Sequence, residues 1–439
     1  MNFSEVLEGF TGKKILVVGD LMLDKHIHGN VSRISPEAPV PVLKAEKETF
    51  NPGGAANVAS NLVTLGAKVY LSGVVGDDDA QKILFNEFRK LNIDTSCIIK
   101  TSKPTIQKVR GISKQHIFRI DYEDSSKINE NEENQLINLI KEKISDVDAV
   151  ILSDYAKGTL TENLVKNIIS LAKGNNKLVT ADCKPINIEF YKNVSLLKPN
   201  KKEAIEMTLK DNVEEAGRKL LEMTQSNILI TRGGEGMSLF FDNEIVNIPS
   251  KAKQVYDVSG AGDTVLATLT LALVAGASLK DASELANKAA AIVIEKPGVV
   301  PIHLEDLKKE HSSNIKVVEK AWGEEEWLVN TEKYCGKRML IRKNYYCSYH
   351  KHKIKEETFY VLNGELEIIK GKVYYVVKSG ETFHVKPEEY HSFRALEDTT
   401  FFEFSTHHSD EDNYRLTQSG NGEHEQWKKE IEGAIIKNG

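Results

Sequence analysis

The sequence predicts two folded units, an α/β unit built on a parallel sheet and an all-β unit that follows it. Up to about residue 300, short apolar runs alternate with helical patterns, which is typical of a parallel sheet covered on both faces. After residue 315, Tyr, Phe, Val and Thr become frequent and turn signals are closely spaced, which favours a β-sandwich or barrel. The length of 439 residues is enough for two or three domains.

Six apolar runs of the first unit are expected to be strands, because each is short, rich in β-branched residues and followed by a helical pattern. These runs are residues 13–20, 68–76, 148–156, 177–183, 194–200 and 227–234. Small residues over 53–67 and an apolar run after Gly260 predict two of the helices. Ligands of such a sheet bind at the carboxyl ends of its strands, so we expect the functional residues there.

Two segments of the first unit, 24–50 and 104–123, depart from this alternation. Both have an extended, alternating character and contain no helical pattern. We expect them to form a small antiparallel flap beside the main sheet.

The boundary between the units is expected at the short polar stretch KKEHSSN. We therefore divide the chain into an α/β unit at 1–305, a linker at 306–315, a β-rich unit at 316–425 and a helical tail at 426–439.

Composition indicates a soluble cytoplasmic protein. The net charge is −6 with the two signs mixed along the chain, so there is no clustered basic surface for nucleic acid. No run of about 18 apolar residues predicts a membrane span, and the amino terminus lacks the apolar core of a signal peptide. The four cysteines are scattered without CxxC spacing, which fits a reducing compartment.

The stretch DVSGAGDTV predicts an anion site with an acid beside it. Gly260, Ala261 and Gly262 precede a long apolar helix, and free backbone N–H groups at a helix amino terminus bind anions. The carboxylate of Asp263 could take the proton of an attacking hydroxyl. Phosphoryl transfer needs little beyond such positioning and charge neutralisation. A lone GxGD is more often a simple helix cap, so this interpretation depends on the accompanying motifs.

Those motifs fall at other strand ends and loop-to-helix junctions. Asp20 and Asp24 follow the first strand and could accept hydrogen bonds from sugar hydroxyls. Asn200 and Glu203 have a spacing that can order water around the magnesium of a triphosphate. The remaining candidates offer close backbone approach to a polyhydroxylated ligand or room for a nucleotide: Gly53, Gly54, Asn57, Thr231, Gly233 and Gly234.

Residues 10 to 305 resemble the ribokinase (pfkB-type) sugar kinases. Within this family they resemble one branch, the D-glycero-D-manno-heptose 7-phosphate kinases of the ADP-heptose pathway. The resemblance is carried by VVGDLMLDKHIHGNVSRISPEAPVPVLK, NPGGAANVASNL, PTIQKVRGISKQHIFRIDYE, VILSDYAKGTL and DVSGAGDTV. It implies a ribokinase-like three-layer sandwich with a small β flap. It also implies ATP-dependent phosphorylation of the heptose 7-phosphate at C1, with magnesium.

The resemblance also implies residue roles. Asp263 would deprotonate the sugar 1-hydroxyl, and the N–H groups of residues 260–262 would hold the transferring phosphoryl. Asn200, Glu203, Thr231, Gly233 and Asn287 would serve magnesium-ATP; Asp20, Asp24, Gly53, Gly54 and Asn57 would hold the sugar; Arg33, Lys108 and Arg110 would clamp the 7-phosphate. Solvated cations on an edge strand are the alternative for the last three. Asp182 and Lys184 stand where the family usually has Asp-Pro-Lys, and their role is left open.

Many proteins of this branch continue into a nucleotidyltransferase that makes the ADP-sugar. That domain needs an HxGH motif, and none follows residue 305. We therefore do not expect this chain to synthesise ADP-heptose.

The second unit carries a predicted metal site. His350 and His352 lie two apart on an expected strand, so both imidazoles face the same side. Glu357 follows, and a later stretch supplies His391. Three histidines and one glutamate make an open site for a divalent transition metal such as Zn, Mn or Fe. His384 is an inward-facing competitor for His391.

Residues 316 to 406 resemble the cupins, whose barrel is a double-stranded β-helix. The opening EKAWGEEEWLVN and KRMLIRKNYYCSYHKH is similar to cupins of the sugar-phosphate isomerase type. There a metal holds adjacent sugar oxygens while a base moves a proton between carbons. The second cupin motif departs from the usual form, because the interval from Pro387 to His391 is one residue short.

Two interpretations of the whole chain remain open. In one, the kinase is fused to a cupin that isomerises or epimerises a related sugar phosphate. In the other, a kinase for another sugar or sugar phosphate carries a non-catalytic cupin that senses a sugar or metal and dimerises the chain. In both, the expected partners are ATP and a small sugar phosphate, with no nucleic acid and no membrane, and the chain is expected to form a homo-oligomer, a dimer.

Overall fold

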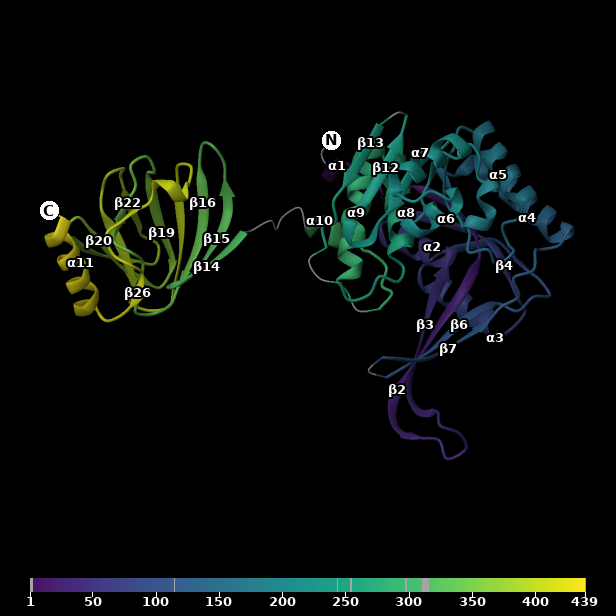
Figure 1. The fold of residues 1–439 in the computed structure, drawn as a ribbon, viewed down its shortest axis with the longest axis horizontal. Helices are drawn as coiled ribbons and strands as arrows, with labels where there is room; N and C mark the ends of the chain where they lie inside the picture. Colours follow the sequence, from purple (N-terminus) through teal and green to yellow (C-terminus); the bar gives the residue numbers. More distant parts are fainter. Residues whose placement is uncertain are drawn as a thin grey trace. The chain divides into compact units, whose positions relative to one another are not determined.

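The computed structural model describes residues 3–113, 115–242, 244–252, 255–296, 298–309 and 316–438, except for the side chains of residues 309, 410 and 438. The chain divides into two compact units, Met1–Lys309 and Glu310–Gly439 (Figure 1). Among the described residues, no helix has the length and apolar character needed to cross a membrane.

The first unit is built on a nine-stranded sheet in the order β13-β12-β11-β10-β9-β8-β1-β4-β5. From β11 to β5 all neighbours are parallel, and β12 and β13 add an antiparallel edge. The strands are β1 (Lys14–Gly19), β4 (Lys68–Val75), β5 (Asp94–Lys100), β8 (Ala149–Ser153), β9 (Leu178–Asp182), β10 (Leu196–Leu197), β11 (Asn227–Thr231), β12 (Met237–Phe241) and β13 (Glu244–Ile248). The strand order reverses between β1 and β8, which is where a ligand crevice is expected.

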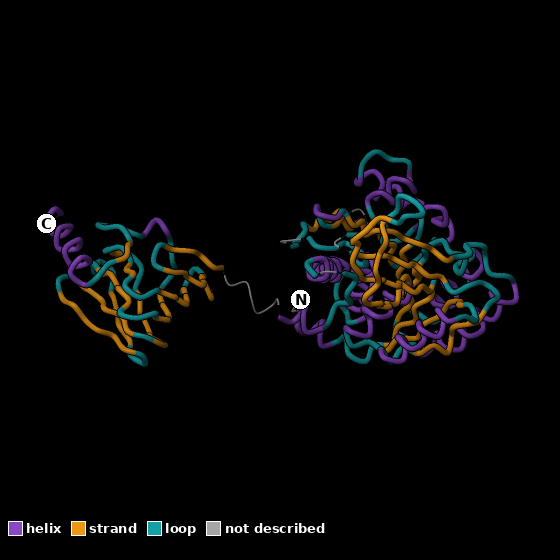
Figure 2. Tube along the Cα trace, turned by 90° about the horizontal axis from the view of Figure 1, so that it is seen from below, coloured by secondary structure: helices purple, strands orange, loops and turns teal. Residues whose placement is uncertain are grey.

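Helices cover both faces of this sheet, as predicted (Figure 2). Alternate side chains of β1 show why: Ile15 and Val17 join one apolar core, and Leu16 and Val18 join the other. The first core is covered by α1 (Phe3–Glu8), α2 (Ala55–Thr64), α3 (Asp79–Lys90), α8 (Ala261–Val274), α9 (Leu279–Ile294) and α10 (Leu304–Lys309). The second is covered by α4 (Glu130–Lys143), α5 (Glu162–Gly174), α6 (Lys201–Thr208) and α7 (Val213–Thr224).

The predicted flap is present as a separate four-stranded sheet in the order β3-β2-β6-β7. Its strands are β2 (Leu21–Ile34), β3 (Pro41–Gly54), β6 (Ile106–Ile112) and β7 (His116–Tyr122). The expectation that it is antiparallel is wrong at its centre, where β2 and β6 run parallel. The reason is that each begins near the carboxyl edge of the main sheet and runs outward from it.

The expected linker at 306–315 begins too early. Residues 306–309 belong to helix α10, whose Leu307 is buried in the first core. The rest of that linker, 310–315, lies outside the described residues.

The second unit has two antiparallel sheets, ordered β14-β15-β16-β24-β19-β22 and β21-β20-β23-β17-β26, with β18 and β25 attached to the latter. Aromatic and aliphatic side chains such as Trp322, Phe359 and Phe393 fill the space between them. The strands are β14 (Lys316–Lys320), β15 (Gly323–Asn330), β16 (Cys335–Ile341), β17 (Tyr345–Tyr346), β18 (His350–Lys351), β19 (Glu357–Asn363), β20 (Glu365–Lys370), β21 (Val373–Lys378), β22 (Thr382–Val385), β23 (His391–Ala395), β24 (Thr399–Ser405), β25 (Tyr414–Arg415) and β26 (Gly420–Asn421).

A helix is found at the end of the chain, α11 (His424–Asn438). It packs Trp427 and Ile431 against Tyr346, Tyr349 and Ile369 of the second unit. The tail is therefore part of the fold of this unit rather than an appendage to it.

Candidate active site and candidate metal centre

The amino terminus of α8 in the first unit is the centre of the candidate active site. Gly260 caps this helix with a φ of 78°, a left-handed conformation that glycine adopts without strain. The helix that follows is buried almost throughout, so its amino terminus is held in place by the core. The backbone of residues 260–262 therefore lies where the sequence predicted an anion site.

Asp263, in the first turn of α8, is 6% exposed and held from two sides. Its Oδ2 accepts a hydrogen bond of 2.7 Å from Asn57 in α2, and its Oδ1 accepts one of 2.8 Å from the Tyr155 hydroxyl. Burial raises the pKa of Asp263 to about 6, although the bonds from Asn57 and Tyr155 and the charge of Lys198 act in the opposite direction. A carboxylate with this pKa suits a general base near neutral pH.

Two side chains of this candidate site were missed by sequence reasoning. Tyr155 lies in LSDYAKG, which was noted only as a family signature, and contacts Asp263 across 108 positions. Lys198 is buried, pairs with Asp182 at 2.7 Å, and its Nζ is 3.4 Å from the point where a Cβ on Gly262 would stand. Lys198 therefore places a cation beside the helix terminus. The sequence signal that could have identified Lys198 is a lysine directly after the short apolar run of a predicted strand, in LLKPN.

Asn200 and Glu203 form the amino-terminal cap of α6. The Asn200 side chain accepts from the Glu203 N–H at 2.9 Å, and the Glu203 carboxylate accepts from the Asn200 N–H at 3.0 Å. The second oxygen of Glu203 pairs with Lys184 at 2.6 Å. Burial acts to raise the pKa of Glu203, but the Asn200 amide and Lys184 outweigh it and the pKa is lowered.

A cavity of about 730 Å³ connects these groups. Its walls include Lys198, Asn200 and Glu203 on one side and the amino terminus of α8 on the other. Thr231 and Gly233, predicted to serve the nucleotide, line it as well. Asn287 lines it from α9, with its amide bonded to the Pro249 carbonyl at 2.8 Å.

Asp20 differs from the prediction. It was expected to accept sugar hydroxyls, but its carboxylate accepts three backbone N–H groups, those of Tyr155, Lys157 and Thr159. It is fully buried. The prediction is wrong because the loop after β8 closes over this strand end, so Asp20 holds the Tyr155 loop in place.

The other predicted sugar-side residues lie at the base of the flap. Gly53 stands beside Asp24, where an added Cβ would come within 2.3 Å of the Asp24 carboxylate, and Gly54 precedes α2 with a φ of 60°. Asp24 pairs with Arg110 at 2.5 Å. Lys108 lies over the Tyr155 ring, with 5.4 Å from Nζ to the ring centroid.

Arg33 is the exception among the flap cations. It is exposed and pairs in register with Val42 on the outer part of the long β2–β3 hairpin. The structure brings Lys108 and Arg110 together at the base of the flap and leaves Arg33 away from them, because β2 continues past the end of β6.

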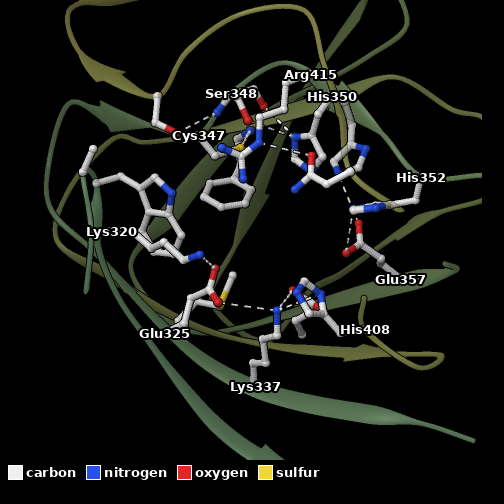
Figure 3. Close-up of a pocket in the computed structure, with 18 of the residues that line it drawn as sticks. Lys320, Glu325, Lys337, Cys347, Ser348, His350, His352, Glu357, His408 and Arg415 are labelled. Atoms are coloured by element: carbon white, nitrogen blue, oxygen red, sulfur yellow. Dashed lines mark hydrogen bonds and ion pairs between the residues drawn. The ribbon is translucent and has the colours of Figure 1, made fainter. Parts of the chain in front are cut away.

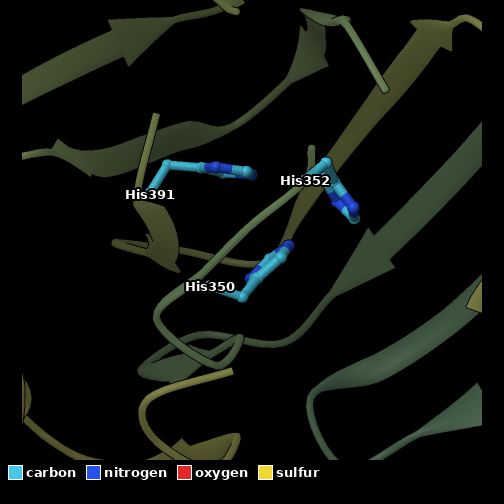
Figure 4. Close-up of side chains that lie close together, drawn as sticks. All are labelled: His350, His352 and His391. Carbon is cyan, nitrogen blue, oxygen red and sulfur yellow. The ribbon is translucent and has the colours of Figure 1, made fainter. Parts of the chain in front are cut away.

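The candidate metal centre is in the second unit, where His350, His352 and His391 converge (Figure 4). One ligand atom from each lies within 4.8 Å of the others, and all three side chains are buried. Pairing of β18 with β23 sets His350 directly opposite His391. Each Nδ1 faces a backbone carbonyl, those of Ser348, Asp412 and Glu389, so Nδ1–H donates and Nε2 is left for a metal.

Glu357 completes the set. Its carboxylate is 3.0 Å from His391 Nε2 and 3.6 Å from His352 Nε2. Burial acts to raise the pKa of Glu357, but Lys355 and the histidines hold it well below its usual value. Burial, followed by the charge of His391, holds the pKa of His350 well below its usual value. A carboxylate and neutral imidazoles are the protonation states that bind a metal.

The donor set fits a divalent transition metal. Glu357 Oε2 and His391 Nε2 are buried and have no conventional hydrogen-bond partner. An ion between them would satisfy both atoms.

His384 is not a competitor for this site. It is exposed, with Nε2 3.0 Å from Glu356 and Nδ1 3.0 Å from the Thr358 hydroxyl. The expectation that it faces inward is wrong, because β22 pairs with β19 in a register that sets His384 opposite Thr358 and buries Val385.

A cavity of about 320 Å³ opens in front of the histidines (Figure 3). Its walls carry Lys355, Glu403, Lys337, Glu325 and Lys320, which adjoin one another in that order. Arg415, Ser348 and Cys347 line another side.

Comparison with known protein families places both units. The profile of the pfkB family carbohydrate kinases matches residues 12–306, and the cupin domain profile matches residues 338–404. The first unit is similar to the bifunctional protein HldE of Helicobacter pylori strain P12, with 45% identity over 303 residues, 67% of this chain and 66% of that protein. HldE of Caulobacter vibrioides is 45% identical over 299 residues, 66% of this chain and 61% of that protein. The chain thus spans less than two thirds of the length of these relatives.

Solved structures show the same fold for the first unit. Ribokinase of Arabidopsis thaliana, complexed with ribose and ATP, has a TM-score of 0.55 at 19% identity and covers 68% of this chain and 98% of its own. Phosphofructokinase-2 of Escherichia coli has a TM-score of 0.57 at 18% identity and the same coverage. The predicted ribokinase-like fold, followed by an all-β cupin region, is confirmed.

Proposed function

The chain belongs to the pfkB family of carbohydrate kinases, and we propose that it phosphorylates D-glycero-D-manno-heptose 7-phosphate at C1 with ATP. The similarity to HldE and the sequence phrases of the heptose kinase branch support this sugar. The main observation in support of kinase chemistry is the position of Asp263. This residue is buried at the amino terminus of α8 and is held by hydrogen bonds from Asn57 and Tyr155.

In the proposed reaction, Asp263 accepts the proton of the C1 hydroxyl as that oxygen attacks the γ-phosphorus of ATP. The bond from that phosphorus to the β,γ-bridging oxygen breaks, and ADP leaves. The N–H groups of residues 260–262 hold the transferring phosphoryl, and the buried ammonium of Lys198 balances its charge. The two hydrogen bonds to Asp263 fix its orientation before the sugar arrives.

ATP fits the large cavity beside α8, with the triphosphate toward Lys198 and the base toward Asn287. Magnesium supplies charge neutralisation on the triphosphate when bound. Asn200 and Glu203 orient groups on that side, with Glu203 already tied to Lys184. Thr231 and Gly233 border the nucleotide.

The sugar is proposed to lie between α2 and the flap. Gly53 and Gly54 let it approach the backbone, and Asn57 and Asp24 bind its hydroxyls. Lys108 and Arg110 are the cations nearest this position and are proposed to hold the 7-phosphate. Arg33 has no role in this proposal, because it lies on the outer part of the β2–β3 hairpin.

For the second unit we propose a metal-loaded cupin that binds a related sugar phosphate and isomerises or epimerises it. The three histidines and Glu357 would hold the metal, which polarises the sugar oxygens when bound. To test this, the intact chain carrying Asp263→Asn and loaded with manganese is incubated with sedoheptulose 7-phosphate and with mannose 6-phosphate. Aldose–ketose interconversion supports the proposal; its absence in both favours a sensing and dimerising cupin.

The kinase proposal is tested by Asp263→Asn. We expect phosphoryl transfer to fall by about three orders of magnitude or more, because the amide cannot accept the proton, while ATP binding is kept. Asp281→Asn is a matched control, since Asp281 occupies the first turn of α9 as Asp263 does that of α8. Substantial turnover by Asp263→Asn would contradict the role of this residue as the base.

A further inference from the structure

The cavity of the cupin unit carries a line of alternating charges that leads away from the metal centre. Lys355 is paired with Glu357, which faces the histidines, and with Glu403 at 2.5 Å. Lys337 follows at 4.0 Å from Glu403 and 3.5 Å from Glu325. Lys320 closes the line at 3.5 Å from Glu325. We call these six side chains the charge ladder.

The charge ladder is costly to bury. The side chains of Lys355, Lys337 and Glu403 are each 4% exposed or less. The attraction within a buried ion pair offsets little more than the free energy needed to remove its two charges from water. A stabilising effect on the fold therefore does not explain why these side chains are buried here. Alternating ammonium and carboxylate groups do match a row of hydroxyls, because each hydroxyl both donates and accepts a hydrogen bond. The ladder is therefore suited to a polyhydroxylated molecule.

Arg415 adds an anion-binding group to the same cavity. It lies directly across from His350 in the β18–β25 pair, so its side chain is on the same face as that of the histidine. Figure 3 shows its guanidinium turned toward the cavity. Its Nε donates to Asn413 at 3.3 Å. Among the side chains that the structure describes, Arg415 is bonded to this amide and forms no ion pair with a carboxylate.

The net charge of the cavity indicates the charge of the ligand that it binds. Four cations, Lys320, Lys337, Lys355 and Arg415, and four anions, Glu319, Glu325, Glu357 and Glu403, line the cavity. These eight charges cancel, so a divalent metal held by the histidines would make the cavity positive. A volume of about 320 Å³ is within the size of small-molecule sites.

We propose that this cavity binds a phosphorylated sugar, with the phosphate on Arg415 and the hydroxyls along the charge ladder. The inference rests on the proposed cupin function and assigns Arg415 as its phosphate-binding residue. Guanidinium is suited to this task, because its fork of N–H groups matches phosphate oxygens.

Tryptophan fluorescence gives a readout confined to the cupin unit. All three tryptophans of the chain, Trp322, Trp327 and Trp427, lie in this unit. Trp322 lines the cavity, and the Trp327 ring is 4.5 Å from Lys337 Nζ. A sugar phosphate bound at the kinase site has no tryptophan in its own unit to report it.

The experiment titrates the zinc-loaded full chain with mannose 6-phosphate, with mannose and with inorganic phosphate. We expect a saturable fluorescence change with mannose 6-phosphate at a Kd at least about tenfold lower than with either other probe. Arg415→Gln should raise the Kd for mannose 6-phosphate by about tenfold or more and leave that for mannose unchanged. Arg338→Gln, an arginine paired with Glu326 on β15 and absent from the cavity lining, is the control and should leave the Kd unchanged.

Equal affinities for mannose 6-phosphate and mannose, or an Arg415→Gln Kd within about twofold of the original, would overturn the assignment. The outcome is separate from that of the proposed chemistry. Binding that depends on Arg415 without aldose–ketose interconversion supports the phosphate site and removes the isomerase. Interconversion with an unaffected Arg415→Gln variant keeps the isomerase and removes the phosphate site.

Discussion

Tyr155 links the proposed catalytic base to the rest of the kinase site. Its hydroxyl donates to Asp263, and its ring lies under Lys108 at 5.4 Å and Lys184 at 5.3 Å. Its backbone N–H is bonded to Asp20. Burial, with the charge of Asp263 next, raises the pKa of the Tyr155 phenol well above its usual value, so it stays a donor throughout the working pH range. Tyr155 is thus a positioning residue that fixes Asp263.

The prediction for Tyr155→Phe concerns the pH profile. The hydrogen bond from Tyr155 lowers the pKa of Asp263, so its removal raises that pKa above about 6. Asp263 must be ionised to accept a proton, so the acid limb of kcat/KM should move to higher pH. The groups that otherwise set this pKa are Asn57, Asp182 and Lys198, and all three stay in the variant.

Tyr191→Phe serves as the control for that profile. Tyr191 is a buried tyrosine whose hydroxyl donates to Asp154 at 2.8 Å, and it is not among the groups that set the pKa of Asp263. Its loss should cost about 1 kcal/mol of stability without moving the acid limb. If both variants shift the limb equally, or neither does, the proposed role of Tyr155 is wrong.

For individual residues, the sequence identified the residue types of the two sites but not all of the contacts that these residues make. Asp263 and the three histidines were found because local motifs carry them. Tyr155 and Lys198 were missed, since their contacts depend on which strands become neighbours in the folded sheet. Asp20 was assigned to the sugar for the same reason: the three N–H groups that occupy it come from a loop about 135 positions away.

The amino terminus of α8 is the element that the kinase proposal requires to be rigid. Gly260→Ala would place a Cβ 2.9 Å from Asn57 Nδ2 and 3.0 Å from Val299, in a left-handed conformation. We expect kcat to fall by roughly a hundredfold, because Asn57 also holds Asp263 and small displacements of catalytic groups are costly. Steady-state kinetics with the stability of each variant measured in parallel checks this.

Gly276→Ala is the control that separates the cost of placing alanine in a left-handed conformation from the displacement of Asn57 near α8. Gly276 has a φ of 91°, and an added Cβ would meet nothing within 4 Å. It should lose about 1–2 kcal/mol of stability, the cost of a left-handed alanine, and keep its kcat. A similar fall in kcat for both variants would show that general destabilisation, rather than the geometry at α8, is responsible.

Strand pairing explains what could be predicted about the elements. Six of the nine strands of the main sheet carry short apolar runs followed by helical patterns, so they were expected from the sequence, whereas β5, β12 and β13 were not among the expected strands. The parallel pairing of β2 with β6 and the outward position of His384 depend on register between distant segments. A shift of one residue reverses the face of every side chain, and local sequence does not determine that register.

Over the whole molecule, the two units have separate cores, and metal binding should stabilise only the cupin core. Zinc at about 100 times its Kd should add about 2.7 kcal/mol to the stability of this unit, because a bound ion favours the folded state. Thermal unfolding followed by tryptophan fluorescence measures it without a contribution from the kinase unit. His352→Ala should abolish the shift, and His384→Ala, altered at an exposed histidine, should keep it. Retention of the full shift by His352→Ala would contradict the metal site.

The proposed kinase activity is tested most directly by the product that the intact chain forms from ATP and D-glycero-D-manno-heptose 7-phosphate. Other sugar 7-phosphates and 6-phosphates are supplied in parallel, and phosphorus NMR locates the new phosphate. We predict the 1,7-bisphosphate, formed with a kcat/KM at least about tenfold above that of any other sugar tested, because Lys108 and Arg110 at the base of the flap are proposed to hold the distal phosphate. Transfer to another position, or a clear preference for another sugar, would contradict it.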